Sequence, residues 1–312
     1  MDLERDPPNF FSGPYIDRRA EAREAAEWMQ EARADPDTRY LLMRGSAQLV
    51  RGAEAPQIAF LEGDHPLVRG APEPHLVLLG WFGGVRCVLV DLAEHEPDAL
   101  PPETRFEELR PLSPLLREQD AGLLAYARGL SIWRMRQRFC GVCGSRTAPE
   151  RAGHVMRCTN PACGQEFFPR IDPAIIVLVT DGERAMLGRQ PGWPPGRYST
   201  IAGFVEPGES LEDAVVREVF EETAVRVTHV DYHSSQPWPF PSSLMLGFLA
   251  SARADAQIRT GGELDDARWF TREQISQGTP LLPPPHAISY HLIAAWFDSG
   301  SAIPLASLRA RR

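Results

Sequence analysis

The feature that most constrains this chain is the stretch 203–225, GFVEPGESLEDAVVREVFEETAV, in which a Pro-Gly turn precedes a run of charged residues. Ser210 followed three residues later by Asp213 is typical of a capped helix N-terminus, so we expect a helix that begins near Leu211. Three carboxylates share one face of that helix: Glu218, Glu221 and Glu222. Because like charges this close repel one another, the pattern indicates a compensating cation.

Mg²⁺ or Mn²⁺ is the usual partner of such carboxylates and typically acts together with the phosphates of a substrate. The alternative is a solvated acidic helix face, which most charge runs on helices are. The wider spacing favours the metal site, because from Gly203 to Val225 it resembles the Nudix box, G-x5-E-x7-R-E-U-x-E-E-x-G-U with U apolar. One residue departs from the box, Ala224 in place of glycine. Alanine there should cost about 1 kcal/mol or shift the helix end.

Composition indicates a folded protein of two or three domains, with 312 residues, 43% of them hydrophobic and 24% charged. The apolar run 174–179 is far shorter than the ~20 residues of a membrane span, and the N-terminus MDLERDPPNFF lacks the pattern of a signal peptide. We therefore expect no membrane partner and a cytoplasmic location. The net charge of −9 argues against bulk binding to nucleic acid.

The pattern of the N-terminal part predicts helices and strands, but it contains no group of residues typical of a catalytic site. Residues 17–33 are rich in helix formers and predict an exposed helix. Residues 40–92 form short apolar runs, of which HLVLLGWF, Gly83-Gly84 and VRCVLVDL predict a β-hairpin with a two-residue turn. A Pro-rich stretch, 97–114, then precedes a helical run, 115–139. We expect an α+β protein whose residues 1–137 form a β-rich domain with flanking helices.

Two cysteine pairs follow, separated by fourteen residues: Cys140-x2-Cys143 and Cys158-x4-Cys163. Four thiolates at this spacing suit tetrahedral zinc in a ribbon, residues 138–168. A complete four-cysteine shell leaves no position for water or substrate, so this zinc should be structural. Gly144 and Gly164 directly follow the pairs and would let backbone N–H groups turn toward the sulfur atoms. A disulfide framework is disfavoured in a reducing compartment.

Downstream of the box, prolines alternate with Trp238 and Phe240 in the segment SQPWPFPSS, residues 235–243. Prolines on both sides hold two aromatic side chains in an extended segment, which suits a flat surface for a nucleobase. The alternative is a rigid loop with buried aromatics. A Pro-rich loop then leads into a C-terminal helix near Ala287.

With these residues in view, the segment 138–297 resembles the NADH pyrophosphatase branch of the Nudix hydrolases, also described as NAD-capped RNA hydrolases. Four features carry the resemblance: the cysteine ribbon, the box, the match of SQPWPFPSS to the signature SQPWPFPxS, and the LPPP run at 282–285. The resemblance implies a Nudix α/β/α sandwich with a mixed sheet over residues 169–300, a tail over 301–312, and a homodimer.

The resemblance also implies the residues of the site. The catalytic set would be Glu222, Glu221, Glu218, Arg217 and Glu209, with Glu209 orienting Arg217. The Mg²⁺ or Mn²⁺ ligands would be Glu218, Glu222, Glu263 and the backbone carbonyl of Ala202. The substrate-binding set would be Phe168, Phe204, Gln236, Pro237, Trp238, Pro239, Phe240, Pro241, Ser242, Ser243 and Ser289. An acidic substrate contact of some relatives is replaced here by Gly153.

The implied activity is hydrolysis of the pyrophosphate of NADH or NAD to NMNH or NMN and AMP, with removal of NAD caps from RNA 5′ ends. Glu222 or Glu221 would act on the attacking water. Two alternatives remain. One is the same chemistry on another nucleoside diphosphate such as ADP-ribose, which the SQPWPFPSS loop disfavours. The other is a zinc-ribbon protein that binds nucleic acid and keeps an inactive Nudix fold, which the intact carboxylates and the acidic charge disfavour.

Overall fold

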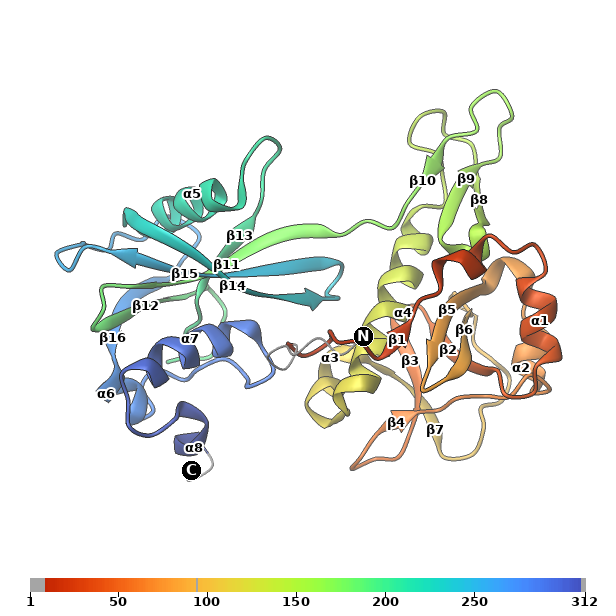
Figure 1. Ribbon diagram of the computed structural model, residues 1–312, viewed down its shortest axis with the longest axis horizontal. Coiled ribbons are helices and arrows are strands. Elements are labelled where there is room, and N and C mark those ends of the chain that lie inside the picture. The colour runs from red at the N-terminus through yellow and green to blue at the C-terminus, as the bar shows by residue number, and fades with distance from the viewer. Residues whose placement is uncertain (1–8, 94, 310–312) are drawn as a thin grey trace. The chain divides into compact units, whose positions relative to one another are not determined.

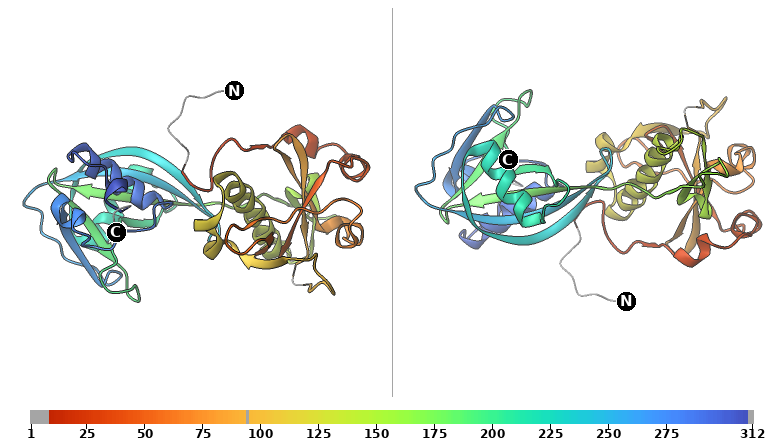
Figure 2. Two further views of the ribbon diagram at one scale, coloured as in Figure 1. Left: turned by 90° about the horizontal axis from the view of Figure 1, so that it is seen from below. Right: turned by 90° about the horizontal axis from the view of Figure 1, so that it is seen from above.

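The computed structural model describes residues 9–93 and 95–309, which form two compact units (Figures 1 and 2). The N-terminal unit contains residues 11–93, 95–171 and 238–242, and the C-terminal unit contains residues 9–10, 172–237 and 243–309. Residues 1–8 and 310–312 lie outside the described residues. The first of these segments contains most of the N-terminus on which the signal-peptide expectation rests, and the second is the end of the expected tail. None of the described helices combines the length and apolar character that a membrane crossing requires.

A mixed sheet forms the centre of the C-terminal unit, in the order β14-β15-β11-β12-β16 with β13 paired to β11. Its strands are β11 (Asp172–Thr180), β12 (Arg184–Arg189), β13 (Ile201–Phe204), β14 (Val227–Trp238), β15 (Ser243–Ala252) and β16 (Asp266–Thr271). Strand β11 runs parallel to β15 and antiparallel to β12 and β13. The helices of the unit are α5 (Leu211–Thr223), α6 (Arg272–Ser276), α7 (Ile288–Ser299) and α8 (Leu305–Arg309).

Alternation along β11 explains why a helix covers each face of this sheet. Successive side chains of a strand point to opposite faces. Val177 packs in one hydrophobic cluster with Val215 of α5, whereas its neighbour Leu178 packs in another with Leu292 of α7. In Figures 1 and 2, α5 and α7 accordingly lie on opposite faces of the sheet. This is the sandwich that the family resemblance implies.

Helix α5 begins and ends at the residues that the box indicates. The Ser210 Oγ accepts from the Asp213 N–H at 3.1 Å, and the Asp213 carboxylate accepts from the Ser210 N–H at 3.3 Å, which completes a capping box. Ala224 takes the left-handed conformation with φ of 57°, and its N–H donates to the Phe220 carbonyl at 2.8 Å. The helix end is therefore not shifted, and alanine bears the conformational strain.

A second sheet forms the centre of the N-terminal unit, in the order β1-β5-β6-β2-β3-β4 with β7 paired to β3. Its strands are β1 (Ile16–Asp17), β2 (Arg39–Arg44), β3 (Ala47–Arg51), β4 (Gln57–Ile58), β5 (Leu76–Phe82), β6 (Val85–Asp91) and β7 (Thr104–Glu108). The α-helices are α1 (Trp28–Ala34), α2 (Pro66–Arg69), α3 (Leu109–Leu112) and α4 (Glu118–Arg136), and the 3₁₀ helices are η1 (Ala20–Arg23), η2 (Glu73–His75), η3 (Ser113–Leu115) and η4 (Arg151–Gly153). Gly83 and Gly84 both take positive φ between β5 and β6, which confirms the predicted hairpin.

The predicted helix over residues 17–33 is interrupted. The structure has η1, a break, and then α1. Both Ala22 and Trp28 pack against the core cluster that contains Leu42. Six positions on a straight helix place two side chains about 120° apart around the axis, so a single helix would point them in clearly different directions. Packing thus overrides helix propensity here.

The zinc ribbon also belongs to the N-terminal unit. Its antiparallel strands pair in the order β10-β9-β8 and are β8 (Thr147–Glu150), β9 (Val155–Cys158) and β10 (Glu166–Phe167). The chain is therefore an α+β protein with a β-rich N-terminal domain, a ribbon and a C-terminal sandwich.

Candidate functional site

A cleft of about 710 Å³ in the C-terminal unit gathers most of the acidic residues that the box singled out. It is lined by Ala174, Ala202, Gly203, Phe204, Glu206, Arg217, Glu218, Glu221, Glu222, Ser243, Met245, Gly261, Gly262 and Glu263. Three elements contribute most of this lining: β13, α5 and the loop before β16. The cleft therefore brings the predicted metal ligands together with one residue of the SQPWPFPSS segment, Ser243.

Arg217 is the centre of a hydrogen-bonded network. Its guanidinium donates to both carboxylate oxygens of Glu209, at 2.6 and 2.9 Å, and its Nη1 donates to Glu218 at 2.8 Å and to Glu221 at 3.0 Å. Its Nη2 donates to the Phe204 carbonyl of β13 at 2.9 Å. The hydrogen bonds to Arg217 lower the pKa of Glu209 to about 2, and those carboxylates raise the pKa of Arg217. The arginine thus ties α5 to β13 and to the loop before the helix.

Gly203 leaves room for the carboxylate of Glu218. A Cβ atom on Gly203 would lie 1.9 Å from the carboxyl carbon of Glu218. The Glu218 side chain therefore lies directly against β13, the strand that also carries Ala202.

Glu222 is the buried carboxylate of the cleft, with 5% of its surface exposed. Burial, together with the charges of Glu218 and Glu263, raises the pKa of Glu222 to about 7. Within the described part of the chain, no hydrogen bond or ion pair reaches its carboxylate. Crowded carboxylate oxygens are the donor set of a hard divalent cation, so Glu218, Glu222 and Glu263 fit such a cation.

Gly261 is a residue of the site that the sequence patterns did not indicate. Its backbone N–H donates to the Glu222 carbonyl at 2.9 Å, which joins the loop carrying Glu263 to the end of α5. The Gly261-Gly262 pair directly before a proposed ligand is the signal that could have found it, because glycine permits close approach of two backbones.

The SQPWPFPSS segment spans the end of β14, a turn and the start of β15. The Gln236 side chain is buried and fully engaged: its Nε2 donates to the carbonyls of Phe10 at 3.1 Å and His286 at 2.8 Å, and its Oε1 accepts from the N–H of Ile288 at 2.9 Å. This side chain therefore fixes the start of the segment to the backbone of residues 10, 286 and 288. Residues 238–242, which carry both aromatic rings, belong to the N-terminal unit.

The other predicted substrate residues lie in three different settings. Phe204 lines the cleft and is 60% exposed. Phe168 belongs to the N-terminal unit and is 59% exposed. Ser289 lies buried in α7.

The four ribbon cysteines are suited to zinc. The Sγ atoms of Cys140 and Cys163 lie 3.7 Å apart, and those of Cys143 and Cys158 lie 3.4 Å apart. Sulfur atoms bound tetrahedrally at zinc–sulfur distances of about 2.3 Å would lie about 3.8 Å apart. The four sulfur atoms all lie within 4.8 Å of one another, close enough to bind one metal ion. Among the described residues, the carboxylates of the cleft do not come together as closely as this.

The glycines after the cysteine pairs take positive φ, 75° at Gly144 and 58° at Gly164. Their own N–H groups donate to the carbonyls of Cys140 and Asn160, and the next amides in the chain, those of Ser145 and Gln165, interact with the sulfur atoms of Cys143 and Cys163. The Val142 N–H also donates to the Cys140 sulfur at 3.4 Å. The glycines therefore make the turns that bring backbone N–H groups toward sulfur, as expected.

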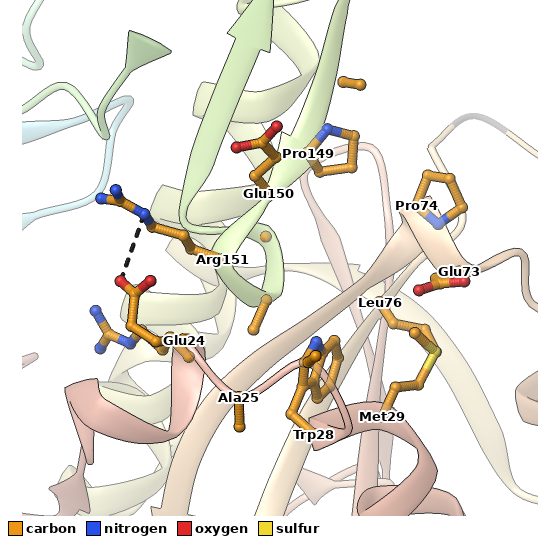
Figure 3. A pocket seen from close by; sticks show the side chains of 15 residues that line it. Glu24, Ala25, Trp28, Met29, Glu73, Pro74, Leu76, Pro149, Glu150 and Arg151 are labelled. Carbon is orange, nitrogen blue, oxygen red and sulfur yellow. Dashed lines mark ion pairs between the residues drawn. The ribbon is translucent and has the colours of Figure 1, made fainter.

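A second cavity, of about 380 Å³, lies in the N-terminal unit between η1, α1, η2 and the ribbon (Figure 3). Trp28 and Met29 form part of its wall, and the Arg151–Glu24 ion pair spans one side at 3.4 Å. Gly153 also lines it, with φ of 89° and no room for a Cβ atom, which would lie 2.3 Å from Arg134 Nη1. A side chain at this position would be strained by the positive φ and would have to displace Arg134 and Val77.

The sandwich and its glutamate-lined cleft define the C-terminal unit as a Nudix hydrolase domain. Residues 170–297 match the family model of the NUDIX domain, residues 136–168 that of the NADH pyrophosphatase zinc ribbon domain, and residues 37–133 that of the NADH pyrophosphatase-like rudimentary NUDIX domain. The N-terminal sheet is thus similar to a reduced copy of the catalytic fold.

Known relatives extend this similarity along most of the chain. The NAD-capped RNA hydrolase NUDT12 of Macaca fascicularis is 35% identical over an alignment of 337 positions that covers 92% of this chain and 73% of that protein. The NAD-capped RNA hydrolase NudC of Pseudomonas aeruginosa is 45% identical over 185 residues, 59% of this chain and 64% of that protein. The chain belongs to the Nudix hydrolase family, in the branch of the NADH pyrophosphatases and NAD-capped RNA hydrolases.

Proposed function

We propose that this enzyme hydrolyses the pyrophosphate bond of NADH and NAD, giving NMNH or NMN and AMP, and that it removes NAD caps from RNA 5′ ends. One observation carries the proposal: Ser243, the last residue of the SQPWPFPSS segment, lines the same cleft as Glu222 and Glu263. The activity named for the NUDT12 relative, which is similar over 92% of this chain, supports it.

Glu218, Glu222, Glu263 and the carbonyl of Ala202 would hold Mg²⁺ or Mn²⁺, which lowers the pKa of a bound water and neutralises phosphate oxygens. Arg217 holds α5 against β13 and keeps Glu218 in place. A carboxylate oxygen of Glu222 or Glu221 accepts the proton of the attacking water.

The substrate residues proposed from the sequence would contribute in different ways. Trp238 supplies a surface for one base, and the exposed rings of Phe204 and Phe168 supply further contacts. Gln236 contributes through its position in the segment, since its side-chain amide is already hydrogen-bonded. The remaining contacts would come from Pro237, Pro239, Phe240, Pro241, Ser242, Ser243 and Ser289.

The ribbon would hold one structural zinc ion, and the enzyme would act as a homodimer in the cytoplasm. Val216 and Phe220, one helical turn apart on α5, are 47% and 41% exposed, which supports an apolar contact with a second copy. The exposed Phe204 ring could then also serve the pocket of the partner subunit.

The test is turnover of NADH by the purified protein with Mg²⁺ or Mn²⁺, with the products identified by chromatography. We expect NMNH and AMP, and a 5′-monophosphate RNA from an NAD-capped transcript. ADP-ribose assayed in parallel should be the poorer substrate. The absence of NADH turnover with either metal, or faster turnover of ADP-ribose, would overturn the proposal.

A further inference from the structure

Three aromatic rings close into a cluster at the tip of the substrate segment. Phe11, Trp238 and Phe240 all belong to the N-terminal unit. Their ring centroids lie 6.2 Å (Phe11–Trp238), 5.8 Å (Phe11–Phe240) and 5.3 Å (Trp238–Phe240) apart, with interplanar angles of 77°, 72° and 78°. Each ring therefore meets both others in the favoured T-shaped geometry. Trp238 cannot turn about its side-chain bonds without losing two ring contacts together.

Two arginines hold the same cluster. The guanidinium of Arg110 lies 4.3 Å from the ring centroid of Phe240 and 5.8 Å from that of Trp238. The guanidinium of Arg128, from the buried helix α4, lies 5.2 Å from the Phe240 centroid, and its Nη1 donates to the carbonyl of Pro239. Cations at these distances from aromatic faces are attracted to them, so the arginines fix the rings from a second side.

The strand that leads into the cluster is paired to the residues directly before Phe11. Within the C-terminal unit, the Asn9 Nδ2 donates to the Oγ of Ser234 and to the carbonyl of Ser235, both at 2.9 Å. The Phe10 carbonyl accepts from Gln236, as described above. Residues 9 and 10 are thus hydrogen-bonded to residues 234–236. The next residue, Phe11, contacts the rings of Trp238 and Phe240.

We propose that Phe11, Arg110 and Arg128 are positioning residues that fix the plane of Trp238 for the base of the substrate. This inference rests on the proposed function. A stacking surface gains affinity when it is ordered before the ligand arrives, because less conformational freedom is then lost on binding. The three residues thus act on substrate selectivity through Trp238, without touching the metal-binding carboxylates.

Steady-state kinetics on NADH test the proposal with Phe11→Ala and with Arg110→Met, a change at an exposed position. We expect KM to rise about tenfold, within the range that one base stack is worth, with kcat within about twofold. In the Trp238→Ala background, Phe11→Ala should add little, because its effect passes through that ring. Arg44→Met is the matched control: Arg44 stands 4.9 Å from the Phe106 ring, outside the cluster, and should leave KM unchanged.

Fluorine NMR of protein labelled with 5-fluorotryptophan reports the ring itself, with the Trp238 signal assigned through Trp238→Phe. We expect that signal to move in Phe11→Ala and in Arg110→Met, and to stay in Arg44→Met. An unmoved signal, an unchanged KM, or fully additive losses in the double variant would overturn the proposal. A parent protein that fails to turn over NADH counts against the proposed function alone, since the fluorine signal needs no turnover and still decides whether Phe11 orients Trp238.

Discussion

The backbone N–H of Gly261 donates a 2.9 Å hydrogen bond to the carbonyl of Glu222, and a Cβ atom on Gly261 would lie 2.4 Å from the backbone oxygen of Glu221. A backbone oxygen cannot swing aside as the end of a side chain can. The position of Glu263 relative to Glu222 therefore depends on the absence of a side chain at residue 261.

Gly261→Ala should consequently lower kcat/KM for NADH on the order of 10²-fold, the loss that a misplacement of about 1 Å can cause. Gly262→Ala is the control, because a Cβ atom there meets nothing within 4 Å. It should stay within about threefold of the parent. Equal rates for the two variants would show that this loop does not set the geometry of the site.

Glu222→Gln should remove nearly all hydrolysis while the fold stays intact. The amide keeps the shape of the buried side chain but loses the charge that a metal ligand needs, so kcat should fall on the order of 10³-fold or more. Circular dichroism checks the fold, and Glu212→Gln, an exposed change in the first turn of α5, should leave the rate unchanged. A Glu222→Gln enzyme with a tenth of the parent rate would contradict the metal-site assignment.

The ribbon should carry one zinc ion per chain, which elemental analysis of protein purified without added metal can measure. Cys158→Ser should lose the zinc and unfold the ribbon, because binding energy and folding energy are coupled at such sites. Cys87→Ala removes the buried cysteine of β6 and should keep the metal. Zinc retained in Cys158→Ser would argue against a four-cysteine shell.

Local patterns in the sequence were sufficient to predict particular elements of both units. The cap at Ser210 and the turn at Gly83-Gly84 depend on backbone requirements that only a few residue types meet, so short motifs specify them. The carboxylates of α5 share a face because helix geometry leaves no other arrangement.

Contacts between distant segments could not be predicted in the same way. Arg128 lies in the middle of α4, and nothing in its neighbourhood in the sequence indicates that it binds the carbonyl of Pro239, 111 positions later. The break between η1 and α1 also depends on a core that strands elsewhere in the chain complete. Such features follow from the packed fold and not from local propensity.

Ala224→Gly should stabilise the protein by about 1 kcal/mol. Ala224 has φ of 57°, a conformation in which the Cβ atom is unfavourable and glycine is not. Chemical denaturation measures the gain, and Ala295→Gly, inside α7, should instead lose about 1 kcal/mol. A variant no more stable than the parent would mean that the left-handed residue is not strained.

The last prediction concerns the pH dependence of stability. His154 is 7% exposed, its Nε2 lies 2.7 Å from the Leu78 carbonyl, and burial, with the charges of Arg23, Arg134 and Arg18, lowers its pKa to about 4. In the unfolded chain the same imidazole titrates near pH 6.5. Between these two values the unfolded state binds a proton that the folded state does not, so the free energy of unfolding must fall as the pH falls.

Between pH 7.5 and 5.5 this difference amounts to about 1 kcal/mol of lost stability, in a range where the ribbon thiolates should still hold zinc. Urea unfolding followed by tryptophan fluorescence measures it at each pH. His154→Gln, which has no titrating ring, should flatten the dependence by that amount, whereas His95→Gln, an exposed change in the same unit, should not. If the parent and His154→Gln lost stability in parallel, other groups would account for the acid sensitivity, and His154 would be charged in the folded state.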